Sequence, residues 1–425
     1  MMTKWRLLLI MSFILIAPSV FLADTADAAW GTSTVDNTTS ANTGEWTSIA
    51  VGTSGATYIS YYDVTGQNLM YATNVSGSWG TTTVDSTSSS VTGPHNSIAV
   101  GTSGAVYISY LDYINRNLMY ATNVSGSWGT TTVDSAGDRG AYTSVAVGTS
   151  GAVYISYYDQ TNTALMYATN VSGAWGTTTL DNIGYLDFLN NDYNFRPIDI
   201  AVGTSGAAYI SYYDAIGSST RYATNVTGSW GSSTIAGGGD VGKYTSIAVG
   251  TSGAVYMSYY DAIGSNTMYA TNVSGSWGSS TIASDGDVGK HNSIAVGTSG
   301  AVYISYYDDT NDDLMYATNV GGTWGTTTVD STGTTGQYTS IDVGTSGAVY
   351  VSYYDNSNSA LKYASNPNHT AVTGAASGVS TSGATLGGTA NATGLPTTAF
   401  FQYGASSGSY TGTSSTQSVS GTSDT

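Results

Sequence analysis

The sequence predicts an all-β protein built around a seven-bladed β-propeller, followed by a partial β-sandwich-like C-terminal segment. The dipeptide Trp-Gly recurs seven times at spacings of 47 to 55 residues, and the intervals carry the same strand-length phrases. Four strands in a unit of about 48 residues are typical of a propeller blade, whereas the coils of a β-solenoid, the competing architecture, have a much shorter period. The seven tryptophans are Trp30, Trp79, Trp128, Trp175, Trp230, Trp277 and Trp324.

The four phrases of each unit are typical of short strands joined by tight turns. In the first unit they run over 48–52, 56–63, 69–74 and 79–85. β-Branched and aromatic residues fill the phrases, and Gly, Ser, Asn and Asp separate them. The second phrase is apolar or aromatic on both of its alternating faces, which indicates a strand in a sheet sandwiched between two neighbours.

The two ends of the repeat complement each other. The strand 30–36 precedes any first-strand phrase, whereas the last unit, 340–366, ends without a Trp-Gly strand. We expect residues 30–36 to supply the fourth strand of the last blade, because this closes the ring and leaves no open end. The predicted propeller therefore spans 30–366.

Residues 1–28 are predicted to be a signal peptide. Lys4 and Arg6 precede an apolar run over 7–22, and the small-x-small tripeptide 26–28 fits a cleavage site. A membrane anchor is the alternative, but the apolar run is at the short limit for a span. We therefore expect a secreted bacterial protein, extracellular or at the cell surface, with no membrane span in the mature chain.

The composition limits the classes of partner and chemistry. The formal net charge is −18, and the nine basic residues are scattered, so no patch could neutralise a nucleic-acid backbone. The chain has no cysteine, which excludes disulfides, thiol nucleophiles and thiolate metal sites. We expect a monomeric propeller that binds no nucleic acid.

One face of the propeller is predicted to carry the candidate ligand-binding residues. Loops between first and second strands, and between third and fourth strands, repeat almost unchanged, whereas the loops of the opposite face vary. This variable face would present seven aspartates at the ends of second strands, around an inner rim of aromatic residues. Aromatic rings stack on sugar C–H faces and carboxylates accept hydroxyl protons, so the pattern indicates a carbohydrate site. Blade packing and Asx-turn capping explain the same repetition without a ligand. The aspartates are Asp63, Asp112, Asp159, Asp214, Asp261, Asp308 and Asp355, and the rim residues are Trp46, His95, Tyr142, Tyr244, His291 and Tyr338.

The connection 182–198 is the clearest departure from the repeat. It is eight residues longer than its counterparts and carries Tyr185, Phe188, Tyr193 and Arg196. Long loops on rigid scaffolds often bind ligands, although a plain surface excursion is the alternative. Tyr185 and Arg196 are therefore further candidate binding residues.

A partial calcium-loop pattern occurs in the sixth unit. Asp309, Asn311 and Asp313 stand at alternate positions, but the following Gly and the distal Glu of a calcium loop are missing. A solvated turn is the alternative. No other cofactor is expected.

The segment 72–79 resembles a degenerate Asp-box of the sialidase-like propellers, with Asn74 at the Asp place, Trp79 at the Trp place and the glycine shifted by one. The similarity to secreted bacterial propellers covers roughly 30–366. Sialidase chemistry would need an arginine triad and a tyrosine activated by a glutamate. The expected mature chain has four arginines and one glutamate, Glu45, in a unit without arginine. The resemblance therefore implies a fold more than an activity.

Residues 367–425 are predicted to form a linker and a partial fibronectin type III-like domain. The phrases 384–390 and 398–404 have the composition of strands, and the stretch resembles the first half of a bacterial domain of this type. A complete sandwich needs about 90 residues or more. A disordered polar tail is the alternative.

Together these observations predict a non-enzymatic extracellular binding or adhesion module, with a glycan or another cell-surface polymer as ligand. The alternatives are a structural surface spacer and a sialidase-like glycoside hydrolase or lyase. No Ser-His-Asp constellation is apparent, and seven equal Asp copies single out no catalytic carboxylate pair.

Overall fold

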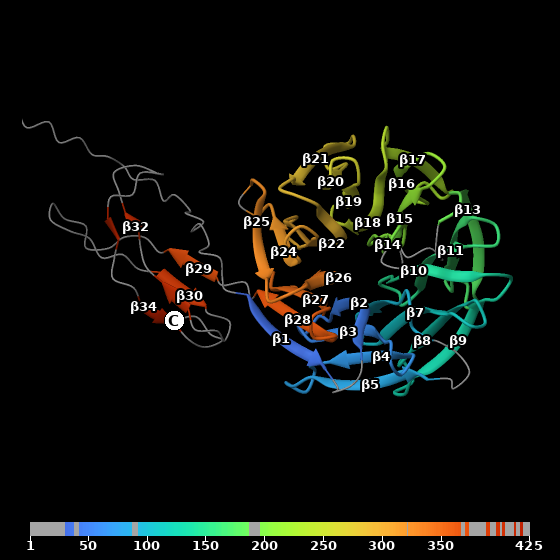
Figure 1. Cartoon of the computed structure of the whole chain (residues 1–425), viewed down its shortest axis with the longest axis horizontal. Helices are drawn as coiled ribbons and strands as arrows, with labels where there is room; N and C mark the ends of the chain where they lie inside the picture. Colours follow the sequence, from blue (N-terminus) through green and yellow to red (C-terminus); the bar gives the residue numbers. More distant parts are fainter. Residues whose placement is uncertain are drawn as a thin grey trace, which may run out of the picture. The chain divides into compact units, whose positions relative to one another are not determined.

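The computed structural model describes residues 30–366, apart from 38–41, 87–91, 187–195 and 321, together with short strands between 370 and 419. The segment Ala29–Asn366 forms one compact unit. In this unit seven antiparallel, four-stranded sheets surround a common axis (Figure 1). The predicted all-β, seven-bladed propeller is therefore confirmed. The predicted signal peptide lies outside the described residues.

Each blade is a meander whose first strand lies nearest the axis. The innermost strands are β2 (Thr43–Val51), β6 (Ser97–Val100), β10 (Arg139–Val147), β14 (Ile198–Val202), β18 (Val241–Val249), β22 (Val288–Val296) and β26 (Thr335–Val343). The second strands are β3 (Thr57–Asp63), β7 (Val106–Asp112), β11 (Val153–Asp159), β15 (Ala208–Asp214), β19 (Val255–Asp261), β23 (Val302–Asp308) and β27 (Val349–Asp355). The third strands are β4 (Asn68–Thr73), β8 (Asn117–Thr122), β12 (Ala164–Thr169), β16 (Ser219–Thr224), β20 (Asn266–Thr271), β24 (Asp313–Thr318) and β28 (Ala360–Asn366). The outermost strands are β5 (Gly80–Asp85), β9 (Gly129–Asp134), β13 (Gly176–Asn182), β17 (Gly231–Ala236), β21 (Gly278–Ala283), β25 (Gly325–Asp330) and β1 (Gly31–Asp36).

The N-terminal strand closes the ring. The seventh sheet has the order β1-β28-β27-β26, with Gly31 opposite Ser365 and Thr34 opposite Lys362. Strands from the two ends of the repeat therefore form one blade, as predicted. In Figure 1 the first strand lies against the last blade. We number the blades 1 to 7 by their innermost strands, from β2 to β26.

The blades pack through aromatic and apolar side chains. β3 is buried on both faces of the sheet, with Tyr58 and Tyr62 on one face and Ile59 and Tyr61 on the other, as expected for a sandwiched strand. At the periphery, each Trp of the Trp-Gly dipeptide packs edge-on against a third-strand tyrosine of the preceding blade, with ring centroids 4.8–5.2 Å apart. The pairs are Trp30–Tyr316, Trp79–Tyr363, Trp128–Tyr71, Trp175–Tyr120, Trp230–Tyr167, Trp277–Tyr222 and Trp324–Tyr269. This T-shaped geometry suits the ring quadrupoles and explains the recurrence of tryptophan without a ligand.

A ring of hydrogen bonds joins the innermost strands around the axis. One side-chain oxygen in each blade accepts the backbone N–H of the next blade, at 2.9–3.4 Å. The acceptors are Ser48, Ser97, Ser144, Asp199, Ser246, Ser293 and Ser340. The bond from Ile49 to Ser340 joins blade 1 to blade 7, so the ring is continuous across the closure.

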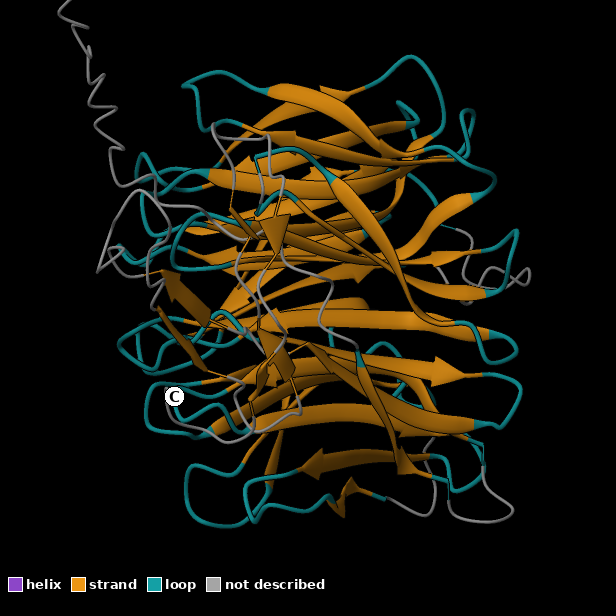
Figure 2. Ribbon diagram, turned by 90° about the vertical axis from the view of Figure 1, so that its left-hand side faces the viewer, coloured by secondary structure: helices purple, strands orange, loops and turns teal. Residues whose placement is uncertain are grey.

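The outer edges and the two loop layers complete the propeller. All seven outermost strands contain a register shift near their C-terminal ends. Such bulges bend an edge and hinder its pairing with another chain. Figure 2 shows the strands running between two layers of loops.

Beyond the propeller, the described strands form three separate two-stranded pairs. They are β29 (Thr370–Thr373) with β30 (Gly388–Asn391), β31 (Thr397–Ala399) with β34 (Gln417–Val419), and β32 (Gln402–Tyr403) with β33 (Gly412–Thr413). The fibronectin type III-like assignment stays a prediction. Within the part of the chain that the structure describes, no helix has the length and apolar character needed to span a membrane.

Candidate functional site

The seven predicted aspartates hold the turns between second and third strands. In each blade the carboxylate accepts the backbone N–H of the residue three positions later, at 2.9–3.3 Å. Five of them, all except Asp63 and Asp261, are buried. Three also form ion pairs, namely Asp159 with Arg139, Asp214 with Arg221 and Asp355 with Lys362. These contacts match Asx-turn capping. Sugar recognition by this ring of aspartates stays a prediction.

The asparagines at the Asp-box place of the resemblance have a similar structural role. In six turns between third and fourth strands, the Asn side-chain oxygen accepts the first backbone N–H of the second strand, at 2.8 Å. These residues are Asn74, Asn123, Asn170, Asn225, Asn272 and Asn319. Their repetition follows from the turn that they hold.

The aromatic rim forms a packed collar around the axis. Its six residues are only 2–6% exposed, and neighbouring ring centroids lie 4.0–5.1 Å apart. Five of them adopt φ between 52° and 56°, a conformation that costs a non-glycine residue about 1–3 kcal/mol. The residues with positive φ are Trp46, His95, Tyr142, His291 and Tyr338. Because the rings cover one another, the collar offers little open surface for stacking on a sugar.

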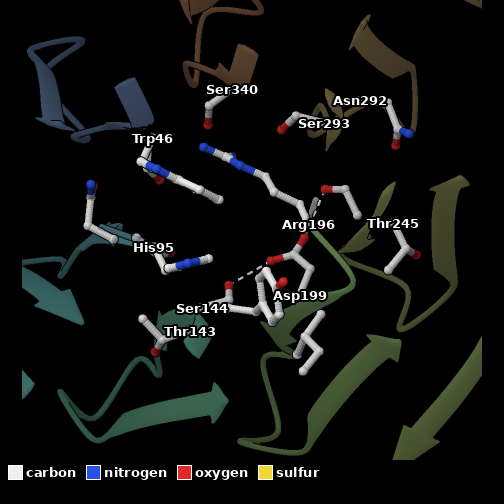
Figure 3. Close-up of a pocket in the computed structure, with 16 residues that line it drawn as sticks. Trp46, His95, Thr143, Ser144, Arg196, Asp199, Thr245, Asn292, Ser293 and Ser340 are labelled. Carbon is white, nitrogen blue, oxygen red and sulfur yellow. Dashed lines mark hydrogen bonds between the residues drawn. The ribbon is translucent and has the colours of Figure 1, made fainter. Parts of the chain in front are cut away.

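Blade 4 interrupts the collar with Arg196. The side chain crosses the axial cavity toward Trp46 and Ser340 (Figure 3), and its Nη2 donates to the main-chain oxygen of Thr47 at 2.7 Å. Burial lowers the pKa of Arg196 to about 10, against the opposing influence of Asp199 and Tyr338. The predicted candidate Arg196 therefore lines the axial cavity, together with Trp46 and Ser340.

Asp199 is a second departure in blade 4, and sequence reasoning missed it. It occupies the place of the axial serine, and its carboxylate accepts hydrogen bonds from Ser144 and Ser246 at 2.7 and 2.8 Å, and from the N–H groups of Ile200 and Ile247 at 2.9 Å. Burial raises the pKa of Asp199, while these hydrogen bonds lower it. The sequence does show this departure, because blade 4 has Asp-Ile-Ala-Val where blade 1 has Ser-Ile-Ala-Val.

Asp342 likewise replaces an alanine at the closure between blades 7 and 1. Its carboxylate accepts the N–H of Val51 at 2.7 Å and of Val343 at 2.8 Å. Burial raises its pKa to about 6, although both hydrogen bonds lower it. The folded chain therefore holds more protons than the unfolded chain between pH 3.8 and about 6, and its stability falls as the pH rises through this window.

We expect Asp342→Ala, which restores the residue of the other six blades, to remove this dependence. The free energy of unfolding of the wild type should fall relative to the variant by up to about 1.4 kcal/mol per pH unit between pH 4 and 6. Urea unfolding at a series of pH values measures the difference. Parallel curves over that range would show that Asp342 has an ordinary pKa.

A separate pocket of about 270 Å³ lies between blades 5 and 6 on the variable face. Its lining comprises Lys243, Tyr244, Tyr260 and Ala262 of blade 5, Lys290, His291, Tyr307 and Asp309 of blade 6, and Gln337 of blade 7. Its volume approaches the roughly 300 Å³ at which small-molecule sites begin. The pocket therefore combines tyrosine rings with ammonium, carboxylate and amide groups.

The charges of this pocket are already paired within the protein. Lys290 contacts Asp287 at 2.9 Å and Asp309 at 2.7 Å, and Lys243 contacts Asp240 at 2.7 Å. Although burial lowers the pKa of Lys290, its two carboxylate partners raise it above the ordinary value. Two lysines thus contact three carboxylates, so this pocket carries no excess of positive charge.

The remaining candidates lie elsewhere. Tyr185 is 54% exposed, and residues 187–195, which include Phe188 and Tyr193, lie outside the described residues. Of the calcium candidates, Asp309 pairs with Lys290, and the amide of Asn311 donates to Asp308 at 2.8 Å. Burial and neighbouring carboxylates raise the pKa of Asp313. Among the described residues, no three His, Cys, Asp or Glu side chains are grouped to hold a metal ion. Calcium binding stays untested.

Comparison with known proteins supports the architecture alone. No protein-family model matches the chain, and no curated protein matches it in sequence. Among solved structures, hydrazine synthase from Kuenenia stuttgartiensis is 10% identical, with a TM-score of 0.50, and the match covers 74% of this chain and 94% of that one. The Aleuria aurantia lectin, solved with Fucα1-6GlcNAc, is 13% identical, with a TM-score of 0.44 and coverages of 69% and 94%. A polysaccharide lyase is 11% identical, with a TM-score of 0.45 and coverages of 74% and 88%. At 10% identity the match to hydrazine synthase shows a shared fold alone.

Proposed function

We propose that this protein is a non-enzymatic, extracellular carbohydrate-binding module whose ligand enters the pocket between blades 5 and 6. The observation that carries this proposal is the lining of that pocket. Lys290, Asp309 and Gln337 supply hydrogen-bond donors and acceptors there, beside the buried rings of Tyr244, Tyr260 and Tyr307. Sugars present many hydroxyl groups, which both donate and accept hydrogen bonds, and a pocket lined by donors and acceptors suits them.

The ionic pairing favours a neutral sugar over an acidic one. The contacts of Lys290 with Asp287 and Asp309 fix its ammonium group, and the third carboxylate, Asp240, fixes Lys243. A ligand carboxylate would have to displace one of these partners. Sugar hydroxyls can instead accept from the ammonium group and donate to Asp309 without breaking the pairs.

The same lining argues for binding rather than hydrolysis. Glycosidases typically use two carboxyl groups across the scissile bond, about 5–10 Å apart. Asp309 is the single carboxylate among the residues that line this pocket, and Lys290 holds it. The pocket is therefore suited to hold a sugar without cleaving it.

Binding to a glycan array, followed by calorimetry with the best ligand, tests the proposal. We expect Lys290→Ala to weaken binding at least tenfold, because a charge-assisted hydrogen bond contributes about 1.5–3 kcal/mol. Gln337→Ala should weaken binding less. Arg116→Ala is the matched control, since it removes the Arg116–Asp138 ion pair of blade 2, outside the pocket.

Three outcomes would contradict the proposal. Equal binding by the wild type and Lys290→Ala would show that the ligand binds elsewhere on the propeller. No binding on the array would favour a structural spacer. Release of new reducing ends from a bound glycan would favour a hydrolase.

A further inference from the structure

We propose that the axial channel binds a small monovalent anion, a halide or a short carboxylate such as formate, against the guanidinium group of Arg196. The cavity at this place has a volume of about 80 Å³, enough for a few small molecules but not for a sugar. None of its lining residues lines the pocket between blades 5 and 6. The two sites are therefore distinct.

The charge of Arg196 has no ion-pair partner among the described residues. No Asp or Glu oxygen of that part of the chain lies within 4.0 Å of its nitrogen atoms, and its hydrogen bond goes to a neutral main-chain oxygen, that of Thr47. The other arginines of the described propeller, Arg116, Arg139 and Arg221, each pair with an aspartate. A charge withdrawn from water needs a partner of opposite sign, so a counter-ion would stabilise Arg196.

Asp199 acts on this charge only from a distance, because it forms no ion pair with Arg196. It lies in the same cavity, but its two oxygens already accept four hydrogen bonds, which fill the acceptor positions of a carboxylate. Among the described residues, only the main-chain oxygen of Thr47 accepts from the Arg196 guanidinium group, so its other N–H groups are available to a guest. The planar fork of a guanidinium group matches a carboxylate, and it also accommodates a halide.

Serine hydroxyl groups supply further donors around the cavity. Each axial serine accepts an N–H from the next blade and still has its own hydrogen to donate. Ser144 and Ser246 donate theirs to Asp199. Ser48, Ser97, Ser293 and Ser340 also line the cavity, and none of them donates to a carboxylate of the described residues. Figure 3 shows Ser293 and Ser340 on the side of the cavity that the Arg196 side chain approaches. The cavity therefore has an excess of hydrogen-bond donors at its Arg196 end.

Two measurements test the site. A crystal of the wild-type protein soaked in sodium bromide should show an anomalous peak beside the Arg196 guanidinium group. In solution, formate can replace gluconate, which is too large for the cavity, at constant ionic strength. Once formate saturates the site, each tenfold increase in its concentration should raise the Tm by about 1–3 °C. Arg196→Gln should abolish this rise, and Arg221→Gln, a control in the same blade but outside the cavity, should retain it.

The bromide soak needs no variant, so it remains decisive even if Arg196→Gln folds poorly. Water alone at the guanidinium group in the soaked crystal would overturn the proposal. An equal formate response in Arg196→Gln would also overturn it. Neither result would bear on glycan binding between blades 5 and 6, because the two sites share no residue.

Discussion

A chain that lacks residues 1–36 is expected to lose the closed propeller. The deletion removes β1 and leaves the edge of β28 unpaired. It also removes Asp36, whose carboxylate accepts the Tyr61 hydroxyl of blade 1 at 2.6 Å and whose main-chain oxygen accepts the Thr43 hydroxyl at 3.2 Å. Trp30, which packs against Tyr316 of blade 6, is lost as well. The combined loss is comparable with the roughly 5–15 kcal/mol that separates a folded domain from its unfolded state.

Size-exclusion chromatography with light scattering and urea unfolding measure this effect. We expect oligomers or aggregates, because an exposed strand edge pairs with other chains. Deletion of residues 1–28 alone is the matched control, since β1 remains and the unfolding midpoint should not change. A synthetic peptide covering 29–36 should partly restore the monomer by adding the missing strand. A truncated chain that stays monomeric with an unchanged urea midpoint would show that closure contributes little.

The architecture could be predicted because each structural feature of a blade recurs in several repeats of the sequence. The Trp-Gly spacing predicted seven blades, and the unmatched strand at 30–36 predicted the closure that β1 and β28 make. Repetition also exposes substitutions, so Asp199 and Asp342 could have been recognised as an Asp in a Ser place and an Asp in an Ala place. Their significance, however, depends on the adjoining blade, which a comparison within the repeat does not show.

The candidate site was harder to predict, because repetition favours residues that serve the fold. The ring of aspartates and the aromatic collar recur in nearly every blade, and the structure places them in turns and in packed contacts. The pocket between blades 5 and 6 instead arises from a combination that no single unit contains. Lys243, Lys290 and Gln337 occupy the same place in successive blades, where blade 1 has Glu45 and blade 3 has Ala141. This place varies between the units, so the phrases that the units share do not single it out.

The two histidines of the collar predict a loss of stability in acid. Burial, together with the charge of Arg196, lowers the pKa of His95 to about 3, and burial, Arg196 and Lys290 lower that of His291 well below 6.5. Below pH 6.5 these two histidines therefore bind protons in the unfolded chain but remain neutral in the folded chain. The free energy of unfolding should fall as the pH drops from 6.5 toward 3, by up to about 1.4 kcal/mol per pH unit for each histidine.

Replacing both histidines by tyrosine should make the free energy of unfolding fall less steeply in acid than it does in the wild type. Tyr142 and Tyr338 occupy the same place in blades 3 and 7 with φ of 53° and 54°, so the backbone accepts tyrosine there. Urea unfolding followed by far-ultraviolet circular dichroism at pH 4 to 7 gives the free energies. Asp342 acts in the opposite direction over part of this range, but it is common to both proteins and cancels in their difference. A difference that stays constant with pH would mean that water reaches the histidines, so that they protonate in the folded ring as easily as in the unfolded chain.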